Sequence, residues 1–434
     1  MRRILYIAHR VPFPPDKGER LRAYHQIQAL AQRFDVTVAA LACHRQDVAA
    51  AEGLRALVRQ VHVVQAGGLW GLARAAASLA AGRSITEGYF ASRCLLRQVE
   101  AAGGHKPFDL AIGYSSGIFP TLLKANARAR VMDLIDVDSV KWADYAASAG
   151  PLRRWLYRLE SRRVAALERR ILQFCDAVLL TSPQEAALLK NSAADIRKVL
   201  PLGNGVDLAY FHPGKTLGGD DRTIVFTGTM NYRPNIQAVT WFVQAVWPGV
   251  RAVRPDAQFV IVGRDPTPAV RRLSREPGVQ VTGSVADVRP YLGRACVAVA
   301  PLHIARGVQN KVLEAMAMGV AVVASGQALE GLEVTAGGDV LRADTAAQWT
   351  AQLRRLLADK NARTSLAHAA RKCVETRYSW PSRLAPLVGL AEALMERKSI
   401  DPARLSPIEA ASAGSLRGIP SVNVAFPAPA TLST

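Results

Sequence analysis

Short apolar segments alternate along the chain with longer segments of helical periodicity. In the first half, buried strands are predicted at Arg3–Ala8, Val36–Leu41, Val61–Gln65, Leu110–Tyr114, Val131–Asp136, Ala177–Thr181 and Lys198–Leu202. Helices are predicted from Glu19 or Arg20 onward and near 46–58, 69–81, 87–102, 152–174 and 184–190. Strands that alternate with helices indicate a mostly parallel sheet covered on both faces.

The same alternation restarts after a segment rich in glycine, proline and charge at 205–222. Its strands are predicted at Thr223–Gly228, Gln258–Gly263, Val279–Gly283, Cys296–Pro301, Val320–Ala324 and Val340–Leu341, and its later helices near 345–358, 362–377 and 381–397. The prediction is an α/β protein of two tandem Rossmann-like domains, 1–205 and 206–380, facing across a cleft. We expect helix 381–398 to pack back on the first domain, and the proline-, alanine- and serine-rich tail 399–434 to be disordered.

The segment Pro301–Ser325 carries the chemistry around which the prediction of function is built. A strand ends there in a glycine-bearing loop, a helix begins near Gln309, and a second strand follows Gly319. Such a loop lies at the carboxyl ends of parallel strands, where the N–H groups of the new helix attract an anion. Lys311 and Glu314 share one face of this helix. They are either a ligand site, with the amine on a phosphate and the carboxylate on sugar hydroxyls, or a solvated ion pair.

A turn with Gly18, Glu19 and Arg20 follows the first strand. Because Gly18 stands alone and no GxGxxG sequence is present, a dinucleotide site is weakly supported. Gly18 either lets a ligand approach the backbone or only closes the turn.

A second turn follows the first strand of the second half. Gly228, Asn231, Arg233 and Asn235 stand there ahead of a helix that has a proline near its first turn. This arrangement predicts another phosphate cradle.

Acidic residues follow the strand that ends near Asp136. Asp138 stands where it can act in catalysis, bind sugar hydroxyls or simply cap the next helix, and capping is the commoner role of such a residue. The next helix, near 152–174, carries seven arginines between Arg153 and Arg170. It is either an ordinary sheet-covering helix with a charged outer face or a basic amphipathic helix that lies on an anionic membrane.

Composition narrows the classes of function. The net charge is +20, and residues 1–200 hold 29 Lys and Arg against 17 Asp and Glu. A basic surface attracts nucleic acid, anionic lipid or anionic small molecules, but no nucleic-acid-binding motif accompanies it, so we expect no nucleic acid partner. Five scattered cysteines without CxxC spacing fit a reduced cytoplasm and no structural metal. No apolar run is long enough to span a bilayer, and the N-terminal apolar segment is too short for a signal peptide.

Four motifs in the same order resemble the GT-B-fold glycosyltransferases of family 4. They are NGVDLAYFHP (204–213), FTGTMNYRPN (226–235), VTGSVADVRPYL (281–292) and RGVQNKVLEAMAMG (306–319). Together with VPFPPDKGERLRAYH and MDLIDVDSVKWADYA, they look most like the sugar transferases associated with PEP-CTERM/exosortase exopolysaccharide systems. The resemblance covers about residues 1–398.

The resemblance implies sugar transfer from a nucleotide-diphosphate donor, as a substrate, to an acceptor hydroxyl, with retention and without a metal or other cofactor. It places the donor on the second domain and the acceptor, a saccharide or lipid-linked saccharide, on the first. Glu314 would bind the ribose hydroxyls. The implied donor-binding residues are Gly228, Arg306, Gly307, Val308, Gln309, Asn310, Lys311 and Glu314, and the acceptor-side loop is Gly18, Glu19 and Arg20.

The chain departs from the family at several of these positions. Arg306 stands where the family has a glutamate that contacts the donor sugar, and an arginine accepts no hydrogen bond. Thr229 and Pro234 stand where the family has cations, so Arg233 and Lys311 are the candidates to balance the diphosphate charge.

The family's N-terminal-domain histidine has no clear counterpart, and Asp138 lies in about its place. The catalytic candidates are therefore Asp138, Lys311 and Arg233, with the cations stabilising the leaving diphosphate.

We expect a cytoplasmic enzyme of exopolysaccharide synthesis, peripheral on the inner face of an anionic membrane. The alternatives are a non-catalytic GT-B subunit, suggested by Arg306, and a sugar-nucleotide epimerase on the same double-Rossmann plan. Nicotinamide oxidoreduction ranks last, since no glycine triplet follows either first strand.

Overall fold

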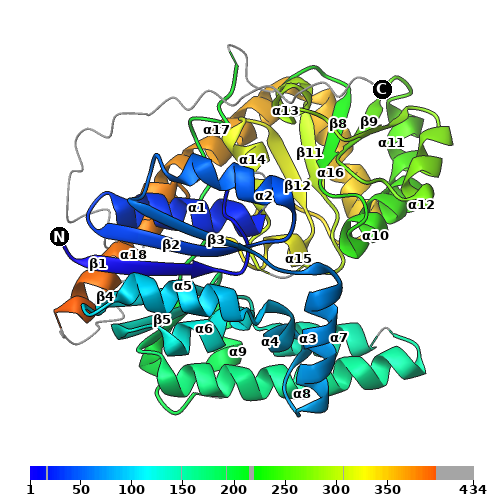
Figure 1. The fold of residues 1–434 in the computed structure, drawn as a ribbon. Helices are drawn as coiled ribbons and strands as arrows, with labels where there is room; N and C mark the ends of the chain where they lie inside the picture. The colour runs from blue at the N-terminus through cyan, green and yellow to red at the C-terminus, as the bar shows by residue number, and fades with distance from the viewer. Residues whose placement is uncertain (16–17, 148, 192, 215–218, 306, 397–434) are drawn as a thin grey trace, which may run out of the picture. The chain divides into compact units, whose positions relative to one another are not determined.

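The chain forms two compact units in a computed structural model that describes residues 1–15, 18–147, 149–191, 193–214, 219–305 and 307–396 (Figure 1). Unit 1 comprises Met1–Gly205 and the described residues from Trp380 onward, and unit 2 comprises Val206–Ser379. The tail expected at 399–434 lies outside the described residues.

Unit 1 is built on a seven-stranded parallel sheet in the order β3-β2-β1-β4-β5-β6-β7. Its strands are β1 (Arg3–Ala8), β2 (Asp35–Ala42), β3 (Gln60–Gln65), β4 (Phe108–Tyr114), β5 (Ala127–Ile135), β6 (Ala177–Leu180) and β7 (Val199–Pro201). All seven strands predicted for this half are confirmed, because short apolar runs bounded by polar turns are the pattern of strands buried on both faces.

Helices cover both faces of this sheet. Along β1, Ile4 and Tyr6 join one core and Leu5 and Ile7 join the other, as side chains alternate across a strand. The first core is closed by α1 (Gly18–Ala31) and α18 (Trp380–Met395), and the second by α5 (Arg93–Gly103), α6 (Phe119–Lys124), α8 (Pro151–Phe174) and α9 (Pro183–Lys190). The remaining helices of the unit are α2 (Arg45–Ala50), α3 (Gly68–Ala80), α4 (Ile85–Phe90) and α7 (Asp138–Ala147).

The single helix predicted near 87–102 is wrong in one respect, because it is two helices. α4 ends at Phe90, and Ser92 begins α5 as its N-cap, with its hydroxyl accepting a hydrogen bond from the Leu95 N–H at 3.2 Å. A serine that caps a helix competes with a continuous helix through the same position.

Unit 2 is a six-stranded parallel sheet in the order β10-β9-β8-β11-β12-β13 around one core. The strands are β8 (Thr223–Thr227), β9 (Gln258–Val262), β10 (Val279–Gly283), β11 (Val297–Ala300), β12 (Ala321–Ala324) and β13 (Leu341–Arg342). The helices are α10 (Arg233–Trp241), α11 (Trp247–Val253), α12 (Pro268–Arg272), α13 (Arg289–Arg294), α14 (Asn310–Ala317), α15 (Gly326–Leu329), α16 (Ala346–Ala358) and α17 (Lys360–Arg377). The six strands predicted here are confirmed as well.

The segment that composition marks as a linker is packed against unit 2 at its start. Phe211 is buried in the core of unit 2, and the Arg289 guanidinium lies 3.9 Å from the centre of the Tyr210 ring. Asp207 accepts hydrogen bonds from the backbone N–H groups of Ala209 and Tyr210, at 3.0 and 2.9 Å. The first residues of the glycine- and proline-rich segment therefore have fixed positions on unit 2.

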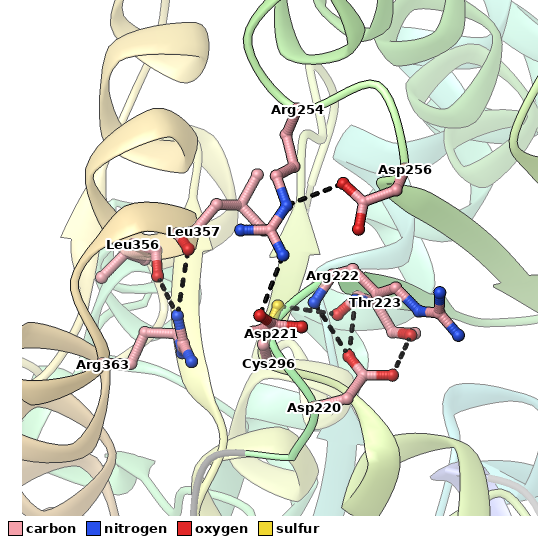
Figure 2. Close-up of polar contacts among 10 residues, drawn as sticks. All are labelled: Asp220, Asp221, Arg222, Thr223, Arg254, Asp256, Cys296, Leu356, Leu357 and Arg363. Carbon is pink, nitrogen blue, oxygen red and sulfur yellow. Dashed lines mark hydrogen bonds and ion pairs between the residues drawn. The ribbon is translucent and has the colours of Figure 1, made fainter.

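A polar cluster closes the amino ends of the strands in unit 2 (Figure 2). Asp220 accepts from the Thr223 N–H at 2.7 Å and from its hydroxyl at 2.6 Å. Arg254 donates to Asp221 at 2.9 Å and to Asp256 at 2.8 Å. Burial tends to raise the pKa of Asp220, but hydrogen bonds from Thr223 and neighbouring groups outweigh it, and the net shift is downward. We call Asp220, Asp221, Thr223, Arg254 and Asp256 the amino-edge cluster.

Across the described part of the chain, every helix is too short or too polar to cross a bilayer.

Candidate functional site

Helix α14 leaves the loop that follows β11, at the carboxyl edge of the unit 2 sheet. Ala315, Met316 and Ala317 are completely buried or nearly so, which brings the helix close to the sheet, as the small residues predict. Lys311 and Glu314 therefore stand one turn apart on a helix whose position is set by its packing.

Lys311 is held by one residue of α10 and one residue of β8. Its Nζ donates to Asn235 Oδ1 at 2.6 Å and lies 4.3 Å from the centre of the Phe226 ring. Burial lowers the pKa of Lys311 to about 7, and the charge of Glu314 opposes that shift only in part. An anion close to Lys311 would stabilise the charged form of its side chain, because water does not fully solvate the ammonium group here.

Glu314 has no hydrogen bond to its carboxylate from any residue that the structure describes. Burial raises its pKa to about 7, and the only opposing influence is the charge of Lys311. Among the described residues no salt bridge within 4.0 Å joins Lys311 to Glu314, although each charge acts on the pKa of the other. A half-buried carboxylate without a donor is suited to accept hydrogen bonds from a ligand.

Gly228 makes room for this arrangement. A Cβ at this position would lie 2.7 Å from Asn235 Nδ2 and 3.2 Å from Lys311 Nζ. On its other side, a Cβ on Gly263 would overlap the Gly228 carbonyl oxygen. The loops after β8 and β9 therefore touch backbone to backbone, and a side chain at 228 would push into the Asn235–Lys311 pair.

The other residues expected on the donor side line the loop before α14. Gly307 has a φ of 63°, a conformation that favours glycine, and Val308 packs against the core of unit 2. Gln309 is the N-cap of α14 and Asn310 its first residue, one position later than predicted. Arg306 lies outside the described residues.

Arg233 is the first residue of α10 and is exposed. It stands two positions before Asn235 on the same helix, whose first turn meets Lys311 through that asparagine. Its expected role beside a diphosphate stays a prediction.

A cavity of about 370 Å³ opens beside the ends of β9 and β10. Its polar lining includes Asp265, Arg271, Ser274, Thr282 and Ser284. The cavity lies on the same carboxyl edge as Lys311, because β10 pairs with β9 and β9 pairs with β8 in this parallel sheet.

In unit 1, Asp138 opens α7 after the end of β5. Its Oδ2 accepts from the Ser116 hydroxyl at 2.8 Å, and its Oδ1 lies 3.9 Å from Lys141 Nζ. Burial raises the pKa of Asp138, against the lowering effects of Lys141 and Ser116. A carboxyl with a raised pKa at the carboxyl end of a strand is a candidate for proton transfer or hydroxyl binding.

Two buried glutamates hold the loop that carries Asp138. Glu168 accepts from the N–H of Ser139 at 3.0 Å and from its hydroxyl at 2.5 Å, while Glu185 accepts from the Val137 N–H at 2.7 Å. Burial raises the pKa of Glu168 to about 7. The sequence does not identify either glutamate as a neighbour of Asp138, because each lies on a helix well after Asp138 in the chain.

On the expected acceptor-side loop, Arg20 Nη2 forms an ion pair with Asp47 Oδ1 at 2.8 Å. Asp47 also accepts from the N–H groups of Cys43 and His44, both at 3.0 Å, so Arg20 braces the loop after β2. Gly18 is the first residue of α1, and the side chain of Glu19 lies outside the described residues.

Backbone strain gathers at the carboxyl edges of both sheets. Of the described residues other than glycine, three have a positive φ: Ser115 after β4, Ile135 at the end of β5, and Asp265 after β9. Such conformations concentrate at functional sites, where surrounding contacts hold them.

Residues 221–359 match a family model described as "Glycosyl transferases group 1". The likeness is to a glycosyltransferase domain of group 1. The match covers most of unit 2 and includes Gly228, Asn235, Lys311 and Glu314. Among curated protein sequences, none matches the chain significantly.

Three similar solved structures come from different proteins. Sucrose-phosphate synthase from Thermosynechococcus elongatus has 18% identity and a TM-score of 0.64, covering 92% of this chain and 100% of its own. HepE from Anabaena, in complex with UDP and glucose, has 15% identity and a TM-score of 0.62, covering 91% and 100%. A putative UDP-N-acetylglucosamine 2-epimerase from Listeria monocytogenes has 14% identity and a TM-score of 0.55, covering 92% and 98%.

At these identities the likeness establishes the fold, which is the GT-B type with two parallel sheets, as predicted. The fold and the group 1 domain together support a GT-B glycosyltransferase.

Proposed function

We propose that the protein transfers a sugar from a nucleotide-diphosphate sugar to an acceptor hydroxyl. The observation that carries the proposal is the pair on α14: a lysine held by Asn235 and Phe226, and a carboxylate one turn later with no donor among the described residues. The amine meets the diphosphate and the carboxylate meets the ribose hydroxyls. The cavity beside β9 and β10 supplies a place for the nucleoside base.

Cleavage of the bond between the anomeric carbon and the diphosphate leaves negative charge on the phosphate oxygens. Lys311, Arg233 and the N-terminal N–H groups of α14 stabilise this charge as it develops. We propose that the acceptor hydroxyl attacks from the side of the leaving group, so that the sugar keeps its anomeric configuration. A phosphate oxygen takes the hydroxyl proton, and Asp138 binds the acceptor in unit 1. No metal or other cofactor is part of this proposal.

The motif series supports a place in exopolysaccharide synthesis, on a saccharide or lipid-linked saccharide at the cytoplasmic face of a membrane. The basic composition of residues 1–200 supports a position near anionic lipid.

A thermal-shift screen across UDP-, GDP- and ADP-sugars tests the proposal, because a donor that binds the folded protein raises its apparent stability. The donor found in this way is then incubated with candidate acceptors, and NMR of the product reads the anomeric configuration. Stabilisation by no nucleotide sugar, or stabilisation that Lys311→Ala and Glu314→Ala leave unchanged, would refute the proposed site. An inverted product contradicts retention alone.

Epimerisation is the second candidate function, because this chain shares its fold with a putative epimerase. An epimerase isomerises the donor when no acceptor is present, whereas a transferase does not. NMR of the donor incubated alone with the protein distinguishes them. A chain that binds donor and performs neither reaction is the non-catalytic subunit.

A further inference from the structure

Helix α3 presents an apolar face to solvent. Leu69 is 84% exposed, Trp70 79% and Leu72 60%. The helix contains no acidic residue, and its one charged residue is Arg74. Exposed large apolar side chains are ordinary when scattered, but three within one turn of one helix form a patch that water solvates poorly.

The first two turns of α8 repeat this composition with added charge. Leu152 is 81% exposed and Trp155 62%, and Arg153 and Arg154 between them are exposed as well. No acidic residue occurs in α8 before Glu160, which is buried and accepts hydrogen bonds from the backbone of α4.

The two helices are joined within unit 1. Arg163 of α8 donates to the carbonyl oxygens of Leu79 at 2.7 Å and Arg83 at 3.0 Å, which fastens the end of α3 to α8. Figure 1 shows the end of α3 meeting α8 partway along its length. We call Leu69, Trp70, Leu72, Leu152, Arg153, Arg154 and Trp155 the α3–α8 surface.

The rest of α8 behaves as a sheet-covering helix. Leu167, Ile171 and Leu172 are buried in the core against the sheet of unit 1, and Val164 is buried as well. Sheet covering is therefore the role of the second half of α8 and leaves the exposed Leu152 and Trp155 without explanation.

We propose that the α3–α8 surface docks on a phospholipid bilayer that carries anionic headgroups. Tryptophan and leucine enter the boundary between headgroups and acyl chains, where an aromatic ring keeps its N–H in contact with water. The arginines reach the headgroup phosphates, and their long side chains allow them to do so while the helix lies on the interface.

Charge decides against a second copy of the chain as the occupant. A two-fold interface places the same patch of both copies face to face, so Arg153 and Arg154 would meet their own equivalents with no acidic residue of the α3–α8 surface between them. An anionic bilayer instead offers apolar and negative groups together.

The inference deepens the proposed function, on which it rests only for the idea that the acceptor is bound to a membrane. Vesicle binding needs no nucleotide sugar, so the two can fail separately. If the protein floats with vesicles but binds no donor, the docking surface is supported and the proposed reaction is contradicted. If it binds donor but does not float with vesicles, the proposed reaction is supported and the docking surface is contradicted.

Co-flotation of the full chain with vesicles tests the inference. One set is pure phosphatidylcholine, and the other contains roughly one phosphatidylglycerol in three lipids. The wild type is expected to float with the anionic vesicles, and less at high salt. The double variant Leu69→Gln/Trp70→Gln and the single variant Trp155→Gln should each reduce the fraction of protein bound to anionic vesicles at least about tenfold. Arg153→Gln and Arg154→Gln should weaken anionic binding about fivefold each.

Matched variants control for general losses. Ile196→Gln removes a comparably exposed apolar side chain at 56% exposure, and Arg354→Gln/Arg355→Gln removes two adjacent exposed arginines from α16 of unit 2. Both should float as the wild type does, and all variants should keep the wild-type melting temperature. The inference is overturned if the wild type does not float, if the surface variants float equally well, or if light scattering finds a dimer that Trp70→Gln abolishes.

Discussion

The two edges of the unit 2 sheet carry similar residue types in opposite states. At the amino edge, Asp220 is surrounded by donors within 3 Å, and its pKa falls below its usual value. At the carboxyl edge, burial raises the pKa of Glu314 to about 7, and no described residue donates to it. A carboxylate with its own donors stabilises the fold, whereas one without them is a cost to stability that a ligand can relieve. This difference supports the carboxyl edge as the proposed ligand site.

The largest effect is expected from Lys311→Ala at the carboxyl edge. Removing the cation that faces the leaving diphosphate should lower kcat for sugar transfer by about 10²–10³-fold. Lys372→Ala, an exposed lysine on α17, is the matched control and should leave kcat unchanged. A Lys311→Ala enzyme with near-normal kcat would place the stabilising charge elsewhere.

Glu314→Gln should separate binding from stability. Donor affinity should fall by about 1–3 kcal/mol, because the ribose hydroxyls lose a charged acceptor. The pKa of Glu314 is raised by folding, so its stabilising effect is present below its unfolded pKa and is lost as pH rises toward about 7. In denaturant unfolding, the free energy of unfolding of the variant should therefore rise relative to that of the wild type between about pH 5 and 7. The change should reach up to about 3 kcal/mol. A constant difference across this range contradicts the burial argument.

Asp220→Ala breaks the amino edge instead. The lost hydrogen bonds to Thr223 should reduce the free energy of unfolding by about 1–3 kcal/mol, with kcat and KM unchanged. Because folding lowers the pKa of Asp220, its contribution is present above its unfolded pKa and disappears as the pH falls through the still lower folded value. Urea unfolding near neutral pH and at strongly acid pH measures the loss of stability and its pH dependence. A change in kcat would contradict the purely structural role of the amino edge.

Arg254→Ala should have the smallest effect. Its ion pairs with Asp221 and Asp256 are exposed, so salt screens them and side-chain entropy offsets them. The melting temperature should fall by no more than about 4 °C, and less at high salt. A larger fall would mean that the amino-edge cluster acts as one cooperative network, which a double variant with Asp220→Ala would measure.

Local patterns in the sequence determined much of this protein. Burial on both faces of a parallel strand requires a short apolar run, so every strand of both sheets could be predicted within a few residues. Helical spacing put Lys311 and Glu314 on one face, and the small residues after Glu314 predicted a close helix. These are relations between near neighbours, which the chain sets without reference to the rest of the fold.

Tertiary structure decided the electrostatic state of these residues. The contact of Lys311 with Asn235 joins positions 76 residues apart, and Glu168 reaches Ser139 from 29 residues away. Whether a carboxylate is surrounded by donors, like Asp220, or lacks them, like Glu314, depends on which loops the sheet brings to its edge. A pKa follows burial and partners in space, so the same residue types become a structural cluster at one edge and a candidate site at the other.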